Sequence, residues 1–184
     1  MTNQLALGQA VRVPNADTDL MTNMQWCLET NLFATEALAE LLDLELPTVE
    51  EPDAGRTRAS TPVEHLATVL RTLSVGPDAV DDEFLRYRLR ALFREARHAA
   101  RALEVGASSS AADLDDLRQV LGHRPDDWYA GEAELERFVL ADADVGAHDE
   151  DLLILFHRRH LRAHALLGPP GSAMATHLPI QTFG

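Results

Sequence analysis

The stretch DEDLLILFHRRHLRAHALL, residues 149–167, decides the fold class of this chain. Its apolar residues recur every three or four positions, which places them on one face of an α-helix. On a helical wheel they form a single arc that consists of Leu152, Leu153, Leu155, Phe156, Ala163, Leu166 and Leu167. The spacing therefore predicts a helix over residues 149–167.

The sequence before this stretch also contains residues that are typical of helix starts and ends. Thr61 and Pro62 are typical of a helix start, and Gly122 is typical of a helix end. A run of small residues at 106–110 predicts a linker between two helices. The predicted helices before the last one are 20–42, 61–76, 80–103, 111–121 and 132–141.

These elements predict an all-α protein, and no convincing pair of strands is found. We expect a single-domain bundle of five to six helices that spans residues 1–184. Three irregular segments complete it: a short extended arm at residues 1–16, a surface loop at 46–60, and a C-terminal loop and tail at 168–184.

The composition indicates which binding partners and which cellular location to expect for the protein. The chain has 184 residues, 46% of them hydrophobic, and a net charge of −14. This charge would be repelled by nucleic acid and by anionic membranes, so neither is expected as the main partner. Cys27 is the single cysteine, which excludes an intrachain disulfide and suits a small buried apolar residue. Without a secretory signal or an apolar stretch of about 20 residues, the expected location is the cytoplasm.

The candidate chemistry lies in the last predicted helix. His157, His160 and His164 follow an i, i+3, i+7 spacing, which predicts that all three share one face. His160 projects deepest into the apolar arc. A neutral imidazole there could bind iron or zinc, or it could form a hydrogen bond with another helix. The three histidines are therefore candidate metal ligands.

The sequence from 156 to 168, FHRRHLRAHALLG, is followed by Gly171, Ser172 and Leu178. This pattern resembles the C-terminal haem-binding segment of the tryptophan 2,3-dioxygenase superfamily. The resemblance implies a small haem-binding oxygenase, or a related redox enzyme, that acts on an aromatic amino acid or a derived metabolite. It also implies that His160 ligates the haem iron and that Gly171 and Ser172 lie near the substrate.

Other residues would complete such a site. Arg159 and Arg162 are candidates for contacts with haem propionates or a substrate carboxylate. Trp128, which with Tyr129 is expected in a loop over 123–131, is a candidate to contact a planar small-molecule substrate. Because the chain is short for burying a haem, we expect a homo-oligomer in which a neighbouring copy completes the pocket.

Two alternatives to haem rest on other residues. Glu95 and His98 form a Glu-x-x-His motif, which non-haem di-iron helical bundles use in two copies. Further carboxylates could come from Glu29, Glu36 or Glu64. The other alternative is a helical interaction protein without cofactor or catalysis.

Five cations repeat along the predicted helix 80–103 at spacings of three and four. They could pair with acidic neighbours or form an anion site. The stripe consists of Arg86, Arg90, Arg94, Arg97 and Arg101.

Overall fold

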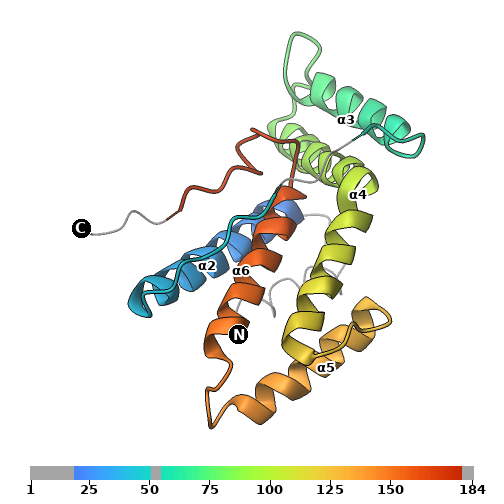
Figure 1. Cartoon of the computed structure of the whole chain (residues 1–184). Helices are drawn as coiled ribbons and strands as arrows, with labels where there is room; N and C mark the ends of the chain where they lie inside the picture. Colours follow the sequence, from blue (N-terminus) through green and yellow to red (C-terminus); the bar gives the residue numbers. More distant parts are fainter. Residues whose placement is uncertain (1–18, 51–54, 180–184) are drawn as a thin grey trace.

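The computed structural model describes residues 19–50 and 55–179, and within them the chain is helical without a strand (Figure 1). This confirms the predicted all-α class. The helices are α2 (Leu20–Leu41), α3 (Ser60–Ser74), α4 (Glu83–Leu121), α5 (Trp128–Asp142) and α6 (Asp149–Ala165).

The long helix α4 organises the molecule (Figure 1). At about 1.5 Å per residue its 39 residues follow a path of about 58 Å along the helix axis, and the two halves of the helix run in different directions. At its N-terminal half, α3 packs around a cluster of Ala67, Leu70 and Ala96. At its other end, α5 and α6 pack around Leu117 and Leu135.

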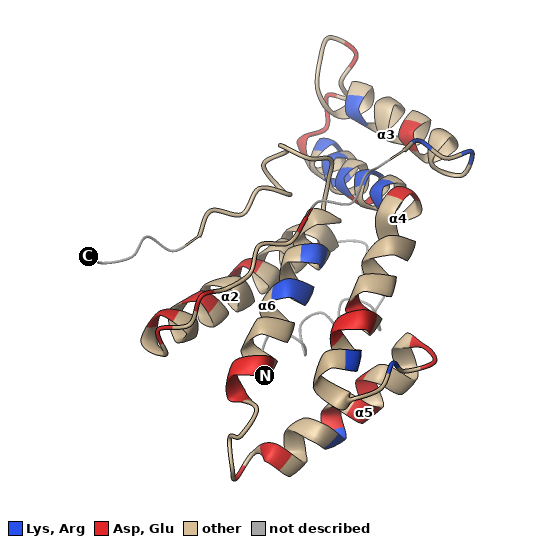
Figure 2. Cartoon of the chain, viewed as in Figure 1, with Lys and Arg blue, Asp and Glu red and all other residues tan. Residues whose placement is uncertain are grey.

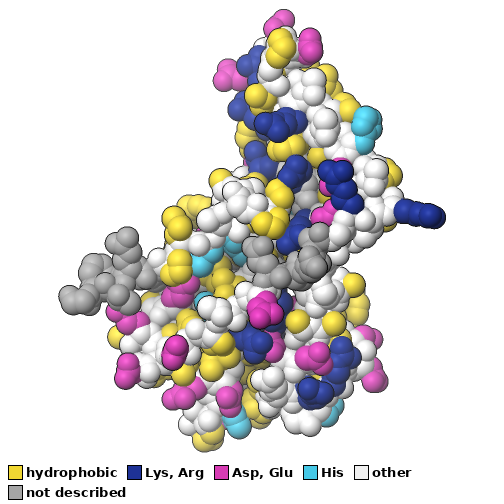
Figure 3. All heavy atoms as spheres, turned by 45° about the horizontal axis from the view of Figure 1, so that its top comes forward, with side chains coloured by type: hydrophobic (Ala, Val, Ile, Leu, Met, Phe, Trp, Pro, Cys, Tyr) yellow, Lys and Arg dark blue, Asp and Glu magenta, His cyan; other side chains and the backbone are white. Residues whose placement is uncertain are grey.

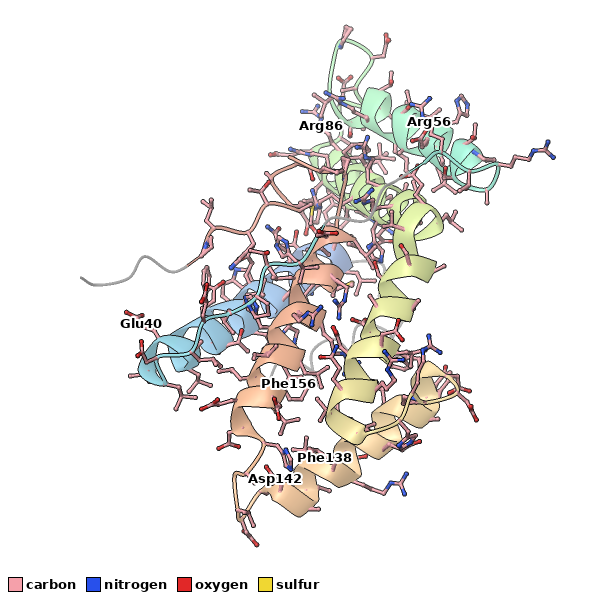
Figure 4. The ribbon with its side chains drawn as sticks, in the orientation of Figure 1. Glu40, Arg56, Arg86, Phe138, Asp142 and Phe156 are labelled. Carbon is pink, nitrogen blue, oxygen red and sulfur yellow. The ribbon has the colours of Figure 1, made fainter. Side chains whose placement is uncertain are left out.

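The second cluster contains several larger side chains. Phe138 on α5 and Phe156 on α6, both labelled in Figure 4, pack against it. Helix α2 lies outside this cluster and packs mainly on α6 (Figure 1). The contact between α2 and α6 positions the candidate site described below.

Local capping explains several helix boundaries. The carboxylate of Asp82 accepts a hydrogen bond from the Leu85 N–H at 2.7 Å, and that of Asp127 accepts one from the Ala130 N–H at 2.9 Å. Gly122 ends α4 with a φ of 80°, the left-handed conformation that glycine adopts without a steric penalty. The predicted stop at Gly122 is confirmed.

Other predicted boundaries were wrong. The helix predicted to start at Thr61 begins at Ser60, because Thr57 and Ser60 exchange hydrogen bonds between side chain and backbone. Trp128 and Tyr129 belong to the first turn of α5 rather than to a loop, because Asp127 caps that helix. The last helix ends at Ala165, two residues earlier than expected.

The three irregular segments are only partly described. Residues 46–50 and 55–59 are non-helical, as the predicted surface loop requires, and so are residues 168–179. The predicted arm at 1–16 and the last five residues of the tail, 180–184, lie outside the described residues.

The largest difference between the predicted and the observed helices is at residues 106–110, where the chain continues as helix instead of forming a linker. Val105 and Ser109, on either side of Gly106, are buried. Their packing holds the helix through a run of weak helix formers, since tertiary contacts override intrinsic propensity.

A substitution at Gly106 tests this continuity. A Cβ at Gly106 would meet only the Ala102 Cβ, at 3.9 Å, which is ordinary contact. We expect Gly106→Ala to stabilise the protein by about 0.5–1 kcal/mol, because alanine is the better helix former. In the matched variant Gly122→Ala, the positive φ makes alanine strained, so stability should fall. Urea unfolding measures both, and destabilisation by Gly106→Ala would contradict an unbroken α4.

Candidate functional site

The contact between α2 and α6 brings acidic and imidazole side chains together. Glu29 and Glu36 are seven positions apart on α2, and His157 and His164 are seven apart on α6. Seven residues make nearly two helical turns, so each pair lies along one edge of its helix. The segment that follows α6 adds His177 between the two glutamates.

These five side chains, which we call the His/Glu cluster, form an alternating chain of close contacts. Glu29 joins His164 Nε2 to Oε1 at 2.7 Å and His177 Nδ1 to Oε2 at 2.6 Å. Glu36 continues it through Oε1, which lies 2.6 Å from His177 Nε2 and 3.8 Å from His157 Nε2. An ionised carboxylate only accepts hydrogen bonds, so each ring nitrogen of His177 that carries hydrogen can donate to one of the two glutamates.

Burial favours the neutral form of two histidines in the cluster, His157 and His164. The side chains of His157, His164 and His177 are 8%, 2% and 7% exposed. Desolvation by burial lowers the pKa of His157 despite the nearby Glu36 carboxylate, and it lowers the pKa of His164 despite Glu29. Both imidazoles are therefore held toward the neutral form, which is the form that ligates metals.

The cluster holds the donor types of a metal centre in a hydrogen-bonded arrangement. Across residues 19–50 and 55–179, no group of three or more His, Cys, Asp or Glu side chains has a geometry that could hold a metal ion as it stands. Two ligands of a tetrahedral ion, each about 2.1 Å from it, lie about 3.4 Å apart. The His–Glu contacts of 2.6–2.7 Å are shorter than this separation and are hydrogen-bond distances.

Cavities lie on both sides of the His/Glu cluster. One, of about 300 Å³, is lined by His164 and His177 together with Val105 and Gly171. The other, of about 720 Å³, is lined by Glu36, His157 and His177. Both volumes are in the range of small-molecule sites. His177 is the side chain of the cluster that lines both cavities and also contacts both glutamates.

His160 lies apart from the other two predicted histidines. Its Nε2 is 3.4 Å from the Asn31 side-chain nitrogen, and its ring stacks on Phe156. Burial, followed by the charge of Arg159, lowers its pKa to about 4. The structure thus places His157 and His164 against the glutamates of α2, and His160 against Asn31 on the same helix.

The two arginines proposed for propionates or a carboxylate substrate have internal partners. Arg159 pairs with Glu132 on α5. Arg162 is buried and pairs with Asp113 and Asp116 on α4. These ion pairs tie α6 to α5 and α4.

The predicted substrate-contacting residues are divided between distant parts of the fold. Gly171 and Ser172 lie in the turn after α6, where Gly171 lines the cavity beside His164. Trp128 is half exposed at the start of α5 and contacts Tyr129 edge-on. Figure 1 shows α5 near the start of α6 and the following segment at the other end of that helix.

His98 of the predicted Glu-x-x-His motif and Glu64, one of the further carboxylates, have other contacts. His98 Nδ1 donates a hydrogen bond to the Leu166 carbonyl at 2.7 Å, which fastens α4 to the end of α6. Glu64 pairs with Arg56 at the surface. Of the carboxylates considered from the sequence, Glu29 and Glu36 are the two that enter the cluster.

Comparisons with known proteins do not assign the chain. A scan against protein-family models and searches of curated proteins and of solved structures found no match. None of the helices in the described part of the chain is long and apolar enough to cross a membrane.

Proposed function

We propose that this chain is a helical metal-binding protein and that the His/Glu cluster is its non-haem metal centre. The observation that carries the proposal is the alternation of three imidazoles with two carboxylates, buried between two helices and a loop. Buried ionisable groups are costly unless they are paired or coordinate metals, and they concentrate at functional sites.

The donor set suits a borderline transition metal such as iron, zinc or manganese. Imidazole and carboxylate ligands favour these ions over the softer ions that thiolates select. In this arrangement Glu36, His157 and His177 would hold one side of the centre, while Glu29 and His164 would hold the other. A bound metal would supply Lewis acidity or redox chemistry, and the adjoining cavities would admit a small-molecule substrate.

Metal titration of the purified full-length chain tests this proposal. After treatment with chelator, calorimetry with Fe²⁺ (without oxygen), Zn²⁺ and Mn²⁺ should show saturable binding of at least one ion. Glu29→Gln and His177→Ala should weaken binding by about 100-fold or more, because loss of an outer partner alone costs 10–100-fold. Elemental analysis of the protein as isolated gives an independent measure.

Matched controls separate ligation from general effects of charge. Glu136→Gln removes an exposed carboxylate from α5, and His123→Ala removes an exposed imidazole beyond the end of α4. Both variants should bind metal like the parent. Circular dichroism checks that every variant is folded. A parent chain that binds none of these ions, or cluster variants that bind them unchanged, would overturn the proposal.

Haem binding at His160 is the second candidate function. The observation in its favour is that burial keeps this imidazole neutral, with a pKa of about 4, as an iron ligand requires. Expression with a haem precursor should then give a Soret band that His160→Ala abolishes and Glu29→Gln preserves. An iron-containing protein without a Soret band would instead support the His/Glu cluster.

Assembly and location complete the proposal. Large apolar side chains are exposed on α2, including Trp26 at 77% and Leu41 at 82%, which supports a homo-oligomer formed through this helix. We further propose a cytoplasmic protein with a small-molecule substrate. Light scattering with Trp26→Ser tests the oligomer: the parent should be larger than one chain, and the variant should be smaller than the parent.

A further inference from the structure

A further cavity, of about 480 Å³, gathers positive charge beside the turn that follows α6. It lies between the end of α3, the first half of α4 and the turn after α6. Arg71 from α3 and Arg90, Arg94 and Arg97 from α4 line it, and none of its lining residues is acidic. Figure 2 shows the same bias, with cations gathered on the half of α4 next to α3.

The geometry of α4 places its cations on one face. Arg90, Arg94 and Arg97 are separated by four and three positions, so they are neighbours on the helix surface. Like charges at these spacings repel each other. The cluster therefore lowers the stability of the free protein unless anions neutralise it.

The described residues neutralise these charges only in part. Arg94 pairs with Asp19. Among residues 19–50 and 55–179, no carboxylate pairs with Arg71, Arg90 or Arg97. Arg86, which starts the stripe and is labelled in Figure 4, donates instead to the Val80 carbonyl at 2.7 Å. Three cations at the cavity thus have no acidic partner in the described part of the chain.

Two residues that line this cavity each have a buried polar atom without a hydrogen-bond partner among the described residues. These atoms are Ser172 Oγ and Arg94 Nε. Buried polar atoms without partners are rare in folded proteins. A hydroxyl and several guanidinium N–H groups around one space suit the oxygens of an anion.

Most of the remaining wall is apolar. Figure 3 shows cations interspersed with hydrophobic side chains on this end of the molecule. The apolar wall is formed by Val75, Phe93, Leu167, Pro169, Ala173 and Met174.

We propose that this cavity binds an organic anion with an apolar body, whose carboxylate or phosphate meets Arg90, Arg97 and Ser172. The cations select the charged group, and Phe93, Leu167 and Met174 contact the hydrocarbon part. This site is separate from the His/Glu cluster and needs no metal.

Calorimetry of the full chain with four probes tests the site. Octanoate and octyl phosphate carry both features, octanol lacks the charge, and inorganic phosphate lacks the apolar body. At least one of the first two should bind saturably with a Kd below about 1 mM, and added salt should weaken it. Octanol and inorganic phosphate should each bind at least about 10-fold more weakly than the better organic anion. Whichever of octanoate and octyl phosphate binds more tightly shows whether the site prefers a carboxylate or a phosphate.

Variants assign the binding to this cavity. The double variant Arg90→Gln, Arg97→Gln should bind the organic anion about 10-fold or more weakly than the parent does, since each arginine supplies charge-assisted hydrogen bonds. Ser172→Ala should weaken it less. Arg118→Gln, at an exposed position on the same helix, should leave it unchanged. Absence of binding, or equal binding by the double variant, would overturn the proposal.

Discussion

Arg162→Ala is expected to destabilise the fold by about 3–5 kcal/mol, the cost of removing one partner from a buried ion pair. The Arg162 side chain is 6% exposed, and Asp116 beside it is 7% exposed. Its Nε also meets Asp113 Oδ1 at 2.6 Å. Without Arg162, the carboxylates of Asp113 and Asp116 lose the cation that they share. Arg158 still pairs with Asp116 but not with Asp113.

Urea unfolding of the parent and the variant measures this effect. Arg124→Ala is the matched control, because Arg124 pairs with Asp115 at the surface, with both side chains exposed. Exposed pairs contribute about 0–1 kcal/mol, so this control should barely change the free energy of unfolding. An equal loss in both variants would show that burial of the Arg162 network contributes nothing.

Acid is expected to destabilise the protein by up to about 3 kcal/mol through His160 alone. Its pKa is about 4 in the folded protein, below the ordinary value of 6.5 that applies in the unfolded chain. Between these values the unfolded state binds more protons, so the free energy of unfolding falls as the pH is lowered from 6.5 to 4. Above pH 6.5 the imidazole is neutral in both the folded and the unfolded state, so this destabilisation is absent. His157 and His164, with lowered pKa values, act in the same direction.

The variant His160→Gln isolates the effect, because glutamine is polar and does not titrate. The free energy of unfolding should be measured at pH 7.5 and pH 4.5 in both proteins. The difference between the two pH values should be smaller in His160→Gln by about 2–3 kcal/mol. His65→Gln, at an exposed position, should keep the pH dependence of the parent. An unchanged pH dependence in His160→Gln would show that the imidazole is solvated.

Much of the fold could be predicted from the sequence because helical periodicity is a local signal. The start of α2 at Leu20, the start of α6 at Asp149 and the stop at Gly122 follow from spacing and capping residues alone. The unbroken course of α4 through Gly106 could not, because it depends on what Val105 and Ser109 pack against. A signal for the true start of α5 was present in Asp127, a typical N-cap residue.

The candidate site could be predicted only in part for the same reason. The spacing of His157 and His164 places both along one edge of their helix, and Glu29 and Glu36 were among the possible carboxylates. The separation of His160 from them depends on how α2 crosses α6. His177 was missed because it lies in an irregular segment, where no periodicity indicates which way a side chain points.

Because α4 is long, the two apolar clusters at its ends can unfold separately. Its two ends belong to different apolar clusters, one shared with α3 and the other with α5 and α6. Cooperative units of this kind can unfold separately, each with its own free energy. The amide protons of α3 should therefore exchange with solvent through an opening that leaves α6 closed. The anion cavity could then be assembled and lost while the His/Glu cluster stays intact.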